Sequence, residues 1–256
     1  MNRMVDFNYE IFNEKAVIYD KTRARYSNNY INLLCKEIYE NKIKIAVDIA
    51  AGTGINTTIL SKYVNQVIAI EPNKDMYKQL KRNILEKNTC LINTTAQHTT
   101  LLDNSVDLIT VAQAFQLLDL KDTKKEFKRI LKKRGKVILV WNSKETKNEL
   151  CLETQKTIKK YSKVYKDDIH SFSFEKDSFN NFFKEQPRFY KFIDDGLNYL
   201  TEEEYIGRAL SASYSLTNKD SKYNLYISDL RKVFHKYAQG NLVYFPLSTI
   251  VYIGEI

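Results

Sequence analysis

The sequence predicts an α/β protein with a doubly wound, mostly parallel sheet, helices on both faces and an inserted helical cap. Short apolar runs at 43–50, 67–70, 106–112 and 136–141 alternate with segments of helical spacing. Short, continuously apolar runs suit strands that are buried on both faces, as parallel strands are. Their alternation with helices implies right-handed crossovers, which place helices on the two faces of the sheet.

Helices are predicted where apolar residues recur three and four positions apart, because that spacing puts them on one helix face. These sets are Tyr30, Leu33, Leu34 and Ile38; Met76, Leu80 and Ile84; and Phe127, Ile130 and Leu131. Pro72 suits the first positions of the second helix, where its missing N–H costs nothing. Gly135 is expected to end the third helix before the next strand begins.

The rest of the chain is expected to form a cap and a return to the sheet. Residues 144–186 are polar and helical at first and then rich in aromatic residues, and "RFYKFID" beyond Pro187 alternates like a strand. A helix begins at Thr201, with Glu204 at the capping-box position. A further helical stripe and a closing strand follow, formed by Tyr226, Leu230, Val233 and Tyr237 and by "STIVYIGEI".

Composition excludes several other classes of protein. Hydrophobic residues make up 43% of the 256, which is enough for a folded core. The three cysteines and three histidines are scattered, so we expect neither a disulfide framework nor a metal site. No apolar run approaches a membrane span, and the first residues have no signal-peptide core, which predicts a cytoplasmic protein.

The net charge of +9 has two interpretations. A basic chain can bind nucleic acid. The lysines are, however, spread over many segments with Glu or Asp nearby, and the densest run, at 124–134, resembles one solvated helix face. We therefore favour a lysine-rich solvated surface and consider a nucleic-acid partner the less favoured interpretation.

A ligand-binding loop is predicted in "AVDIAAGTGINTTIL", residues 46–60. Asp48 lies at the carboxyl end of the first strand, the edge where open α/β sheets bind ligands. Gly52 and Gly54 allow a tight turn and a close approach of the backbone to a ligand. The helix that begins near Ile55 then directs its N-terminal N–H groups at the same place.

Glu71 ends the second strand, 23 residues after Asp48. A carboxylate at this distance can accept hydrogen bonds from ribose hydroxyls. The dinucleotide fingerprint G-x-G-x-x-G is incomplete, because Thr57 stands where the third glycine belongs. This difference argues against a nicotinamide cofactor.

Four segments together resemble the class I S-adenosylmethionine-dependent methyltransferases. These are "VDIAAGTG", "IAIEPNKDM", "TTAQHTTLLDNSVDLITVAQAF" and "ILKKRGKVILVWNS". More narrowly, the chain is similar to the bacterial small-molecule group of ubiquinone-biosynthesis-type and trans-aconitate-type enzymes. The resemblance implies a Rossmann-like, seven-stranded sheet in one domain over 1–256, with a cofactor-binding core at 26–143, a cap or lid at 144–200 and C-terminal helices and strands at 201–256.

The resemblance also implies S-adenosylmethionine as cofactor and a set of contacts with it. Asp48 would lie near the methionine moiety, and Glu71 would hold the ribose. The floor of the loop would be formed by Ala50, Gly52 and Gly54. The adenine would contact Asn73, Met76, Ala96 and Gln97. Gln113 would face the methyl group. The candidate acceptor-pocket residues are Tyr26, Phe115, Gln116, Arg208 and Tyr214.

Three positions depart from the pattern of the family. Ala50 replaces the usual first glycine, which either tightens the loop or weakens cofactor binding. Gln97 stands where an acid is common. Gln116 and Leu117 stand where many relatives carry His and Trp, so the acceptor and any base that acts on it stay open.

We therefore expect a methyltransferase that aligns a small-molecule acceptor with the methyl group for in-line displacement and excludes water. The N-P-P-[FY] motif of amino-methylating DNA enzymes is absent where "AQAF" stands. An RNA or protein methyltransferase and a non-catalytic cofactor-binding protein are the alternatives. The acceptor, the methylated atom, the oligomeric state and the pathway cannot be read from the sequence.

Overall fold

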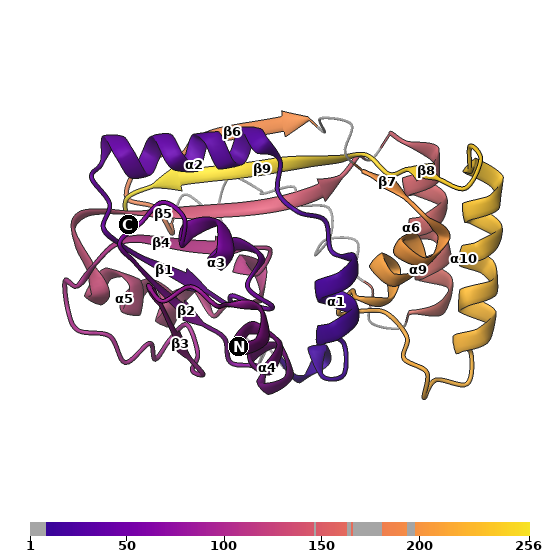
Figure 1. Ribbon diagram of the computed structural model, residues 1–256, viewed down its shortest axis with the longest axis horizontal. Coiled ribbons are helices and arrows are strands. Elements are labelled where there is room, and N and C mark those ends of the chain that lie inside the picture. Colours follow the sequence, from indigo (N-terminus) through magenta and orange to yellow (C-terminus); the bar gives the residue numbers. More distant parts are fainter. Residues whose placement is uncertain (1–8, 146, 163–164, 166–180, 194–197) are drawn as a thin grey trace.

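The computed structural model describes residues 9–145, 147–162, 165, 181–193 and 198–256. Its centre is a seven-stranded sheet with the strand order β3-β2-β1-β4-β5-β9-β6 (Figure 1). The strands are β1 (Ile45–Ile49), β2 (Gln66–Ile70), β3 (Thr89–Ile92), β4 (Val106–Ala112), β5 (Leu131–Lys144), β6 (Arg188–Ile193) and β9 (Leu247–Gly254). The pairs among β1 to β5 are parallel, and β9 runs antiparallel to β5 and β6. The mostly parallel doubly wound sheet is therefore confirmed.

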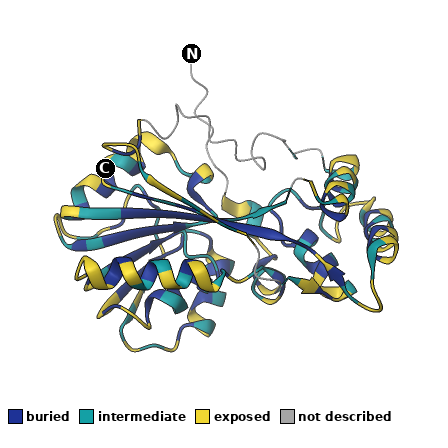
Figure 2. Ribbon diagram, turned by 90° about the horizontal axis from the view of Figure 1, so that it is seen from above, coloured by how far each residue is buried: buried dark blue, intermediate teal, exposed yellow. Residues whose placement is uncertain are grey.

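Helices cover both faces of this sheet, and Figure 2 shows its strands buried between them. They are α2 (Asn28–Glu40), α3 (Ile55–Leu60), α4 (Lys74–Asn83) and α5 (Leu120–Ile130). On one face, α2 and α3 contribute Tyr30, Leu34 and Leu60 to a buried cluster with β1, β2 and β4. On the opposite face, Phe127 and Ile130 of α5 pack against other residues of the same strands.

A smaller helical layer lies at one end of the sheet (Figure 1). It consists of α6 (Glu149–Tyr161), α9 (Glu202–Leu210), α10 (Tyr223–Tyr237) and the short pair β7 (Tyr199–Leu200) and β8 (Val243–Tyr244). These elements share one apolar cluster. The helix of the predicted cap segment thus packs with the helices of the predicted C-terminal segment, and β6 of the cap segment joins the main sheet.

Most of the aromatic run "HSFSFEKDSFNNFF", together with His170, lies outside the described residues. Its last two members are described. Phe182 and Phe183 are buried in the main core, where the Phe182 ring meets Phe115 at 4.7 Å and Phe127 at 6.2 Å between ring centroids.

Two helix ends differ from the sequence prediction. Helix α4 begins at Lys74 with Asn73 as its N-cap, so Pro72 lies just before the helix. Helix α5 ends at Ile130 and β5 follows at once, which places Gly135 inside the strand. The register of β5 against β4 shifts after the first pair, and this irregularity takes up the extra residues that the sequence pattern assigned to a helix end.

The N-terminal segment connects the sheet to the helical layer. It contains η1 (Tyr9–Phe12) and α1 (Ala16–Thr22), and α1 lies between the sheet and α9 (Figure 1). Buried Lys15 donates hydrogen bonds through Nζ to the backbone oxygens of Ala212 at 2.7 Å, Ser213 at 3.4 Å and Ser215 at 3.0 Å. Burial lowers the pKa of Lys15 to about 8.

Candidate functional site

The loop after β1 turns through three residues with positive φ. These angles are 53° at Ala50, 60° at Gly52 and 94° at Gly54. The Ala51 N–H donates to the Ile70 oxygen at 3.0 Å, which ties the loop to the end of β2. A left-handed conformation costs a residue with a Cβ about 1–2 kcal/mol, so Ala50 carries backbone strain that a glycine would not.

The two glycines of this loop have different surroundings. A Cβ at Gly52 would meet no atom within 4 Å, so the loop is open there. A Cβ at Gly54 would lie 2.8 Å from Leu80 Cδ1 and 3.0 Å from Ile84 Cδ1. Gly54 therefore allows α4 to pack closely against the start of α3, whereas Gly52 leaves space over the loop.

Asp48 lies beneath this loop and has no exposed surface. Its carboxylate accepts hydrogen bonds from Asn56 Nδ2 at 2.9 Å, Thr57 Oγ1 at 2.7 Å and Thr110 Oγ1 at 2.9 Å. Burial raises its pKa, and these donors oppose the shift. Asp48 thus joins β1 to the first turn of α3 and to β4, and it lies behind the loop rather than in the wall of a cavity.

Glu71 follows β2 and faces the same loop. It is 5% exposed and accepts the N–H of Gly52 at 2.7 Å and the N–H of Asn73 at 2.8 Å. Burial raises the pKa of Glu71 to about 7 despite these two donors. The Asn73 side chain caps α4 by accepting from the N–H groups of Asp75 and Met76 and also donates to the backbone oxygen of Tyr9.

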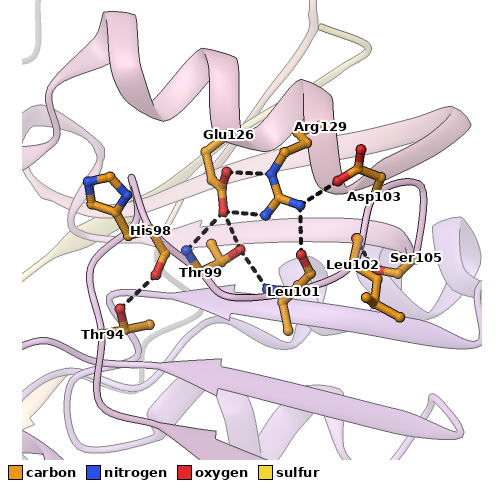
Figure 3. Close-up of polar contacts among 9 residues, drawn as sticks. All are labelled: Thr94, His98, Thr99, Leu101, Leu102, Asp103, Ser105, Glu126 and Arg129. Atoms are coloured by element: carbon orange, nitrogen blue, oxygen red, sulfur yellow. Dashed lines mark hydrogen bonds and ion pairs between the residues drawn. The ribbon is translucent and has the colours of Figure 1, made fainter.

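A network of charged side chains holds the loop after β3 (Figure 3). The buried Glu126 carboxylate accepts from the N–H and Oγ1 of Thr99 at 2.9 and 2.5 Å. Arg129 donates to Glu126 through Nε and Nη2, both at 2.8 Å, and to the Leu101 oxygen at 2.7 Å. These contacts, Arg129 foremost, lower the pKa of Glu126 to about 2. The loop segment that contains Ala96 and Gln97 is thereby fixed to α5.

A first cavity, here the Glu71 cavity, opens over the carboxyl ends of β1, β2 and β4. Seven of the predicted cofactor contacts line it: Ala50, Gly52, Glu71, Met76, Ala96, Gln97 and Gln113. The predicted contacts Asp48, Gly54 and Asn73 do not, because they stand behind the loop or cap a helix. The N-terminal residues Tyr9, Phe12 and Tyr19 close its outer side, and no local sequence signal identified them.

A second cavity, here the Arg208 cavity, lies between the sheet and the helical layer. The predicted acceptor-pocket residues Tyr26, Arg208 and Tyr214 line it. Its wall also contains residues that the sequence patterns did not single out, namely Arg23, Asn142, Lys144 and Phe245. Arg23 follows α1, Asn142 and Lys144 belong to β5, and Phe245 lies between β8 and β9, so only the tertiary fold brings them together.

The two cavities meet. Tyr19, Ala50, Gly52, Ala112 and Gln113 line both of them. Gln113 follows β4 with a φ of 64°, and its N–H donates to the Val140 oxygen at 2.8 Å. This backbone bond holds Gln113 at the junction of the cavities.

Two predicted acceptor-pocket residues line neither cavity. Phe115 is 3% exposed and packs edge-on against Trp141 and Phe182. Gln116 accepts from Trp141 Nε1 at 3.0 Å and donates to the Gln113 oxygen at 2.9 Å. Both residues belong to the short helix η2 (Phe115–Leu117), in which Phe115 packs into the core, Gln116 is exposed and Leu117 lines the Glu71 cavity.

The described part of the chain holds no group of three His, Cys, Asp or Glu side chains placed to bind a metal ion. None of the helices in the described ranges is long and apolar enough to cross a membrane.

Comparisons with known proteins agree with this geometry. Residues 47–139 match the family model "Methyltransferase domain". The chain is 28% identical to a methyltransferase-like protein of Schizosaccharomyces pombe over 165 residues, which are 63% of this chain and 61% of that one. It is 37% identical to an uncharacterized methyltransferase of Mycobacterium tuberculosis over 99 residues, 39% of this chain and 40% of that one.

A third relative is the probable S-adenosylmethionine-dependent methyltransferase CRG1 of Saccharomyces cerevisiae, with 27% identity over 128 residues, 48% of this chain and 44% of that one. The chain thus spans about half the length of the curated relatives it matches.

Solved structures share the fold at low sequence identity. A protein of Anaeromyxobacter dehalogenans aligns with a TM-score of 0.60 at 14% identity, over 91% of this chain and 97% of that one. The YcgJ protein of Bacillus subtilis aligns with a TM-score of 0.53 at 17% identity, over 90% and 100% of the two chains. Residues 47–139 therefore match a methyltransferase domain, and in sequence and fold the chain is similar to S-adenosylmethionine-dependent methyltransferases.

Proposed function

We propose that this protein transfers a methyl group from S-adenosylmethionine to a small-molecule acceptor. The observation that carries the proposal is the junction of the two cavities at Ala50, Gly52 and Gln113. One cavity has the groups that an adenosine needs, and the other opens from its inner end toward the helical layer. A donor and an acceptor can therefore meet at the junction.

The Glu71 cavity fits the adenosine part of the cofactor. Glu71 is a buried carboxylate in the cavity wall, where it would accept hydrogen bonds from the ribose hydroxyls. Met76 and Ala96 provide an apolar border for the adenine, and Gln97 provides an amide there. The open space over Gly52 lets the ligand lie directly on the loop backbone.

Arg23 is the residue that fits the methionine carboxylate. Its guanidinium lies 4.8 Å from the centroid of the Tyr19 ring, and Tyr19 lines both cavities. Its Nε atom is buried and has no hydrogen-bond partner among the described residues. A buried donor without a partner is costly, and a carboxylate at this place would satisfy it.

S-adenosylmethionine supplies a methyl group on a sulfonium, and the protein has to align that methyl with the acceptor and keep water out. Gln113 and Tyr19 border the junction, and Tyr26 is 8% exposed beside it. The Arg208 cavity lies between the sheet and the helical layer, a setting that suits a small molecule better than a nucleic acid strand.

Thermal denaturation with ligand tests this proposal. We expect S-adenosylhomocysteine to raise the melting temperature and NAD to leave it unchanged, because a ligand of the native state stabilises it. Incubation with methyl-labelled S-adenosylmethionine and a library of small molecules should then transfer label to one class of acceptor. A melting temperature that responds to NAD but not to S-adenosylhomocysteine would contradict the proposal.

A further inference from the structure

The Arg208 cavity is a cationic pocket. Arg23, Lys144 and Arg208 line it, and its described lining contains no Asp, Glu or His. We assign Arg23 to the cofactor carboxylate, which leaves Lys144 and Arg208 toward the helical layer. Two cations in a partly enclosed cavity favour an anion there, because their attraction is screened less than on an open surface.

Lys144 and Arg208 are held around one aromatic ring. Lys144 Nζ lies 5.9 Å and Arg208 Cζ lies 5.8 Å from the centroid of the Phe245 ring. Lys144 is the last residue of β5, Arg208 is in α9, and Phe245 precedes β9, so the ring sits where sheet and helical layer join. Contacts of this kind hold both cations at the cavity wall.

Lys144 has no ion pair with any acid in the described part of the chain. The neighbouring carboxylate of Glu145 is bonded to Lys191 at 3.2 Å and to the Ser248 hydroxyl. Arg208 donates to the Thr22 oxygen at 3.3 Å and to Asn198 Oδ1 at 3.4 Å. The ammonium of Lys144 is therefore available to a ligand.

Much of the remaining wall of this cavity is apolar or aromatic, beside the polar side chains of Thr53, Asn56, Asn142 and Thr154. Ile158, Tyr205, Tyr214 and Leu247 line it beside Phe245. An anion that carried only charge would leave these surfaces facing water. A ligand with an anionic group at one end and an apolar or aromatic body satisfies both parts of the wall.

We propose that the methyl acceptor is a small organic acid whose anionic oxygen group, a carboxylate or a phosphate, binds between Lys144 and Arg208. Its apolar body lies against Phe245, Tyr214 and Ile158. This inference rests on the proposed function, because it describes the substrate of the same site. It adds the charge of the acceptor and the residue that selects it, Lys144.

Ligand pairs that differ only in charge test the proposal. The melting temperature is measured with saturating S-adenosylhomocysteine and then with 3-phenylpropionate, hexanoate or phenyl phosphate, and with 3-phenylpropionamide and hexanamide as neutral counterparts. We expect at least one acid to raise the melting temperature further and its amide to have no effect. Comparison of phenyl phosphate with the two carboxylates distinguishes a phosphate site from a carboxylate site.

Lys144→Gln is the variant that separates binding from packing. We expect it to weaken the binding of the acid by about tenfold or more, as for loss of a charged hydrogen bond, and to leave S-adenosylhomocysteine affinity unchanged. Lys147→Gln is the matched control, because Lys147 is exposed, is outside the cavity lining and carries the same charge. It should bind the acid like the unmodified protein.

The outcomes separate this inference from the proposed function. Failure of S-adenosylhomocysteine to stabilise the protein would overturn the proposed function itself. If it stabilises the protein but no acid exceeds its amide, or if Lys144→Gln binds the acid as well as the control does, the anionic acceptor is wrong and the methyltransferase proposal stands.

Discussion

Gly52 and Gly54 stand two positions apart in one loop, yet they differ in what they allow. Both have positive φ, so both favour glycine. Around Gly52 there is open space, and around Gly54 there are the side chains of Leu80 and Ile84. Gly52 therefore leaves space over the loop, which we assign to the ligand, and Gly54 allows α4 to pack closely.

We expect Gly52→Val to abolish S-adenosylhomocysteine binding, because the side chain occupies the space above the loop. The left-handed backbone costs it about 1–2 kcal/mol of stability. Gly54→Ala should lose more stability, because a Cβ clash is added to the same strain, while the folded protein still binds the ligand. Urea denaturation and calorimetry measure the two effects. Full binding by folded Gly52→Val would contradict this division.

Ala50 has the same left-handed backbone without being a glycine. Ala50→Gly relieves that strain but adds the greater unfolded-state freedom of glycine, so the free energy of unfolding should rise by about 0.5–1 kcal/mol. The affinity for S-adenosylhomocysteine should be kept. A less stable Ala50→Gly protein in urea denaturation would show that Ala50 makes packing contacts that outweigh its strain.

Glu71 predicts a pH dependence of cofactor binding. Its pKa in the folded protein is about 7, raised by burial. Ribose hydroxyls donate hydrogen bonds to the ionised form, so binding removes the proton and affinity should rise as pH increases from about 6 to 8. The free energy of unfolding depends on pH in the opposite direction. Because the pKa of Glu71 is raised in the folded protein, protonated Glu71 favours folding, and this contribution is lost as pH rises through about 7.

Calorimetry across this pH range checks the prediction for Glu71, with buffers of different ionisation enthalpy to count the released proton. Glu71→Ala should weaken affinity by about 1–3 kcal/mol at pH 8, where polar groups lose their partner, and should remove the pH dependence. Unchanged affinity in this variant would refute the ribose assignment.

At the scale of elements, the wall of the Glu71 cavity depends on how the loop after β3 is attached to α5. Glu126 bonds the Thr99 backbone and Arg129 bonds the Leu101 oxygen, so the helix holds both sides of that loop. Ala96 and Gln97, which border the Glu71 cavity, owe their position to this attachment. Only the three-dimensional structure shows this attachment, because Glu126 and Thr99 lie 27 residues apart in the sequence.

We expect Glu126→Ala to lower stability by about 1–3 kcal/mol, since it leaves the Thr99 N–H and Arg129 without their acceptor. It should also weaken S-adenosylhomocysteine binding. The depressed pKa of Glu126, about 2, means that its contribution is present above about pH 4.5 and is lost as pH falls toward 2. Asp103→Asn is the control: it loses an ion pair whose Asp side chain is 70% exposed, so little should change.

At the scale of the whole molecule, α1 closes both cavities and is fastened to the helical layer through Lys15. Three backbone oxygens after α9 accept hydrogen bonds from Lys15 Nζ, and Tyr19 of α1 borders the junction of the cavities. Loss of these hydrogen bonds should therefore expose the site to solvent as well as destabilise the fold.

We expect Lys15→Ala to lower the free energy of unfolding by about 1–3 kcal/mol, since buried carbonyls lose their donor. Limited proteolysis should then cut the N-terminal segment faster, and S-adenosylhomocysteine should slow the cut. Lys36→Ala is the matched control, because Lys36 is exposed and, among the described residues, its ion pair is a long contact with Glu40 at 3.9 Å. Equal proteolysis of the two variants would refute the role of Lys15.

The sequence predicted the architecture because each buried strand and each amphipathic helix has a recognisable local pattern of apolar residues. It predicted Gly52 and Glu71 as site residues for the same reason, since each follows the carboxyl end of a strand, and both line the Glu71 cavity. It misassigned the end of α5, because Gly135 is a glycine in an irregular strand. Phe115 and Gln116 were expected at the acceptor, but Phe115 is buried in the core and neither residue lines a cavity described above.

By itself, then, the sequence determined the mostly parallel doubly wound sheet, and it predicted the loop and the carboxylate that we assign to the cofactor. The tertiary structure alone decided that Tyr19 lies at the junction of two cavities and that Lys144 and Arg208 both lie near the Phe245 ring. The physical reason is the separation along the chain between the residues that interact. Strands, turns and caps depend on neighbours within a few residues, whereas the wall of the Arg208 cavity is assembled by packing between segments as far apart in the chain as Tyr19 and Leu247.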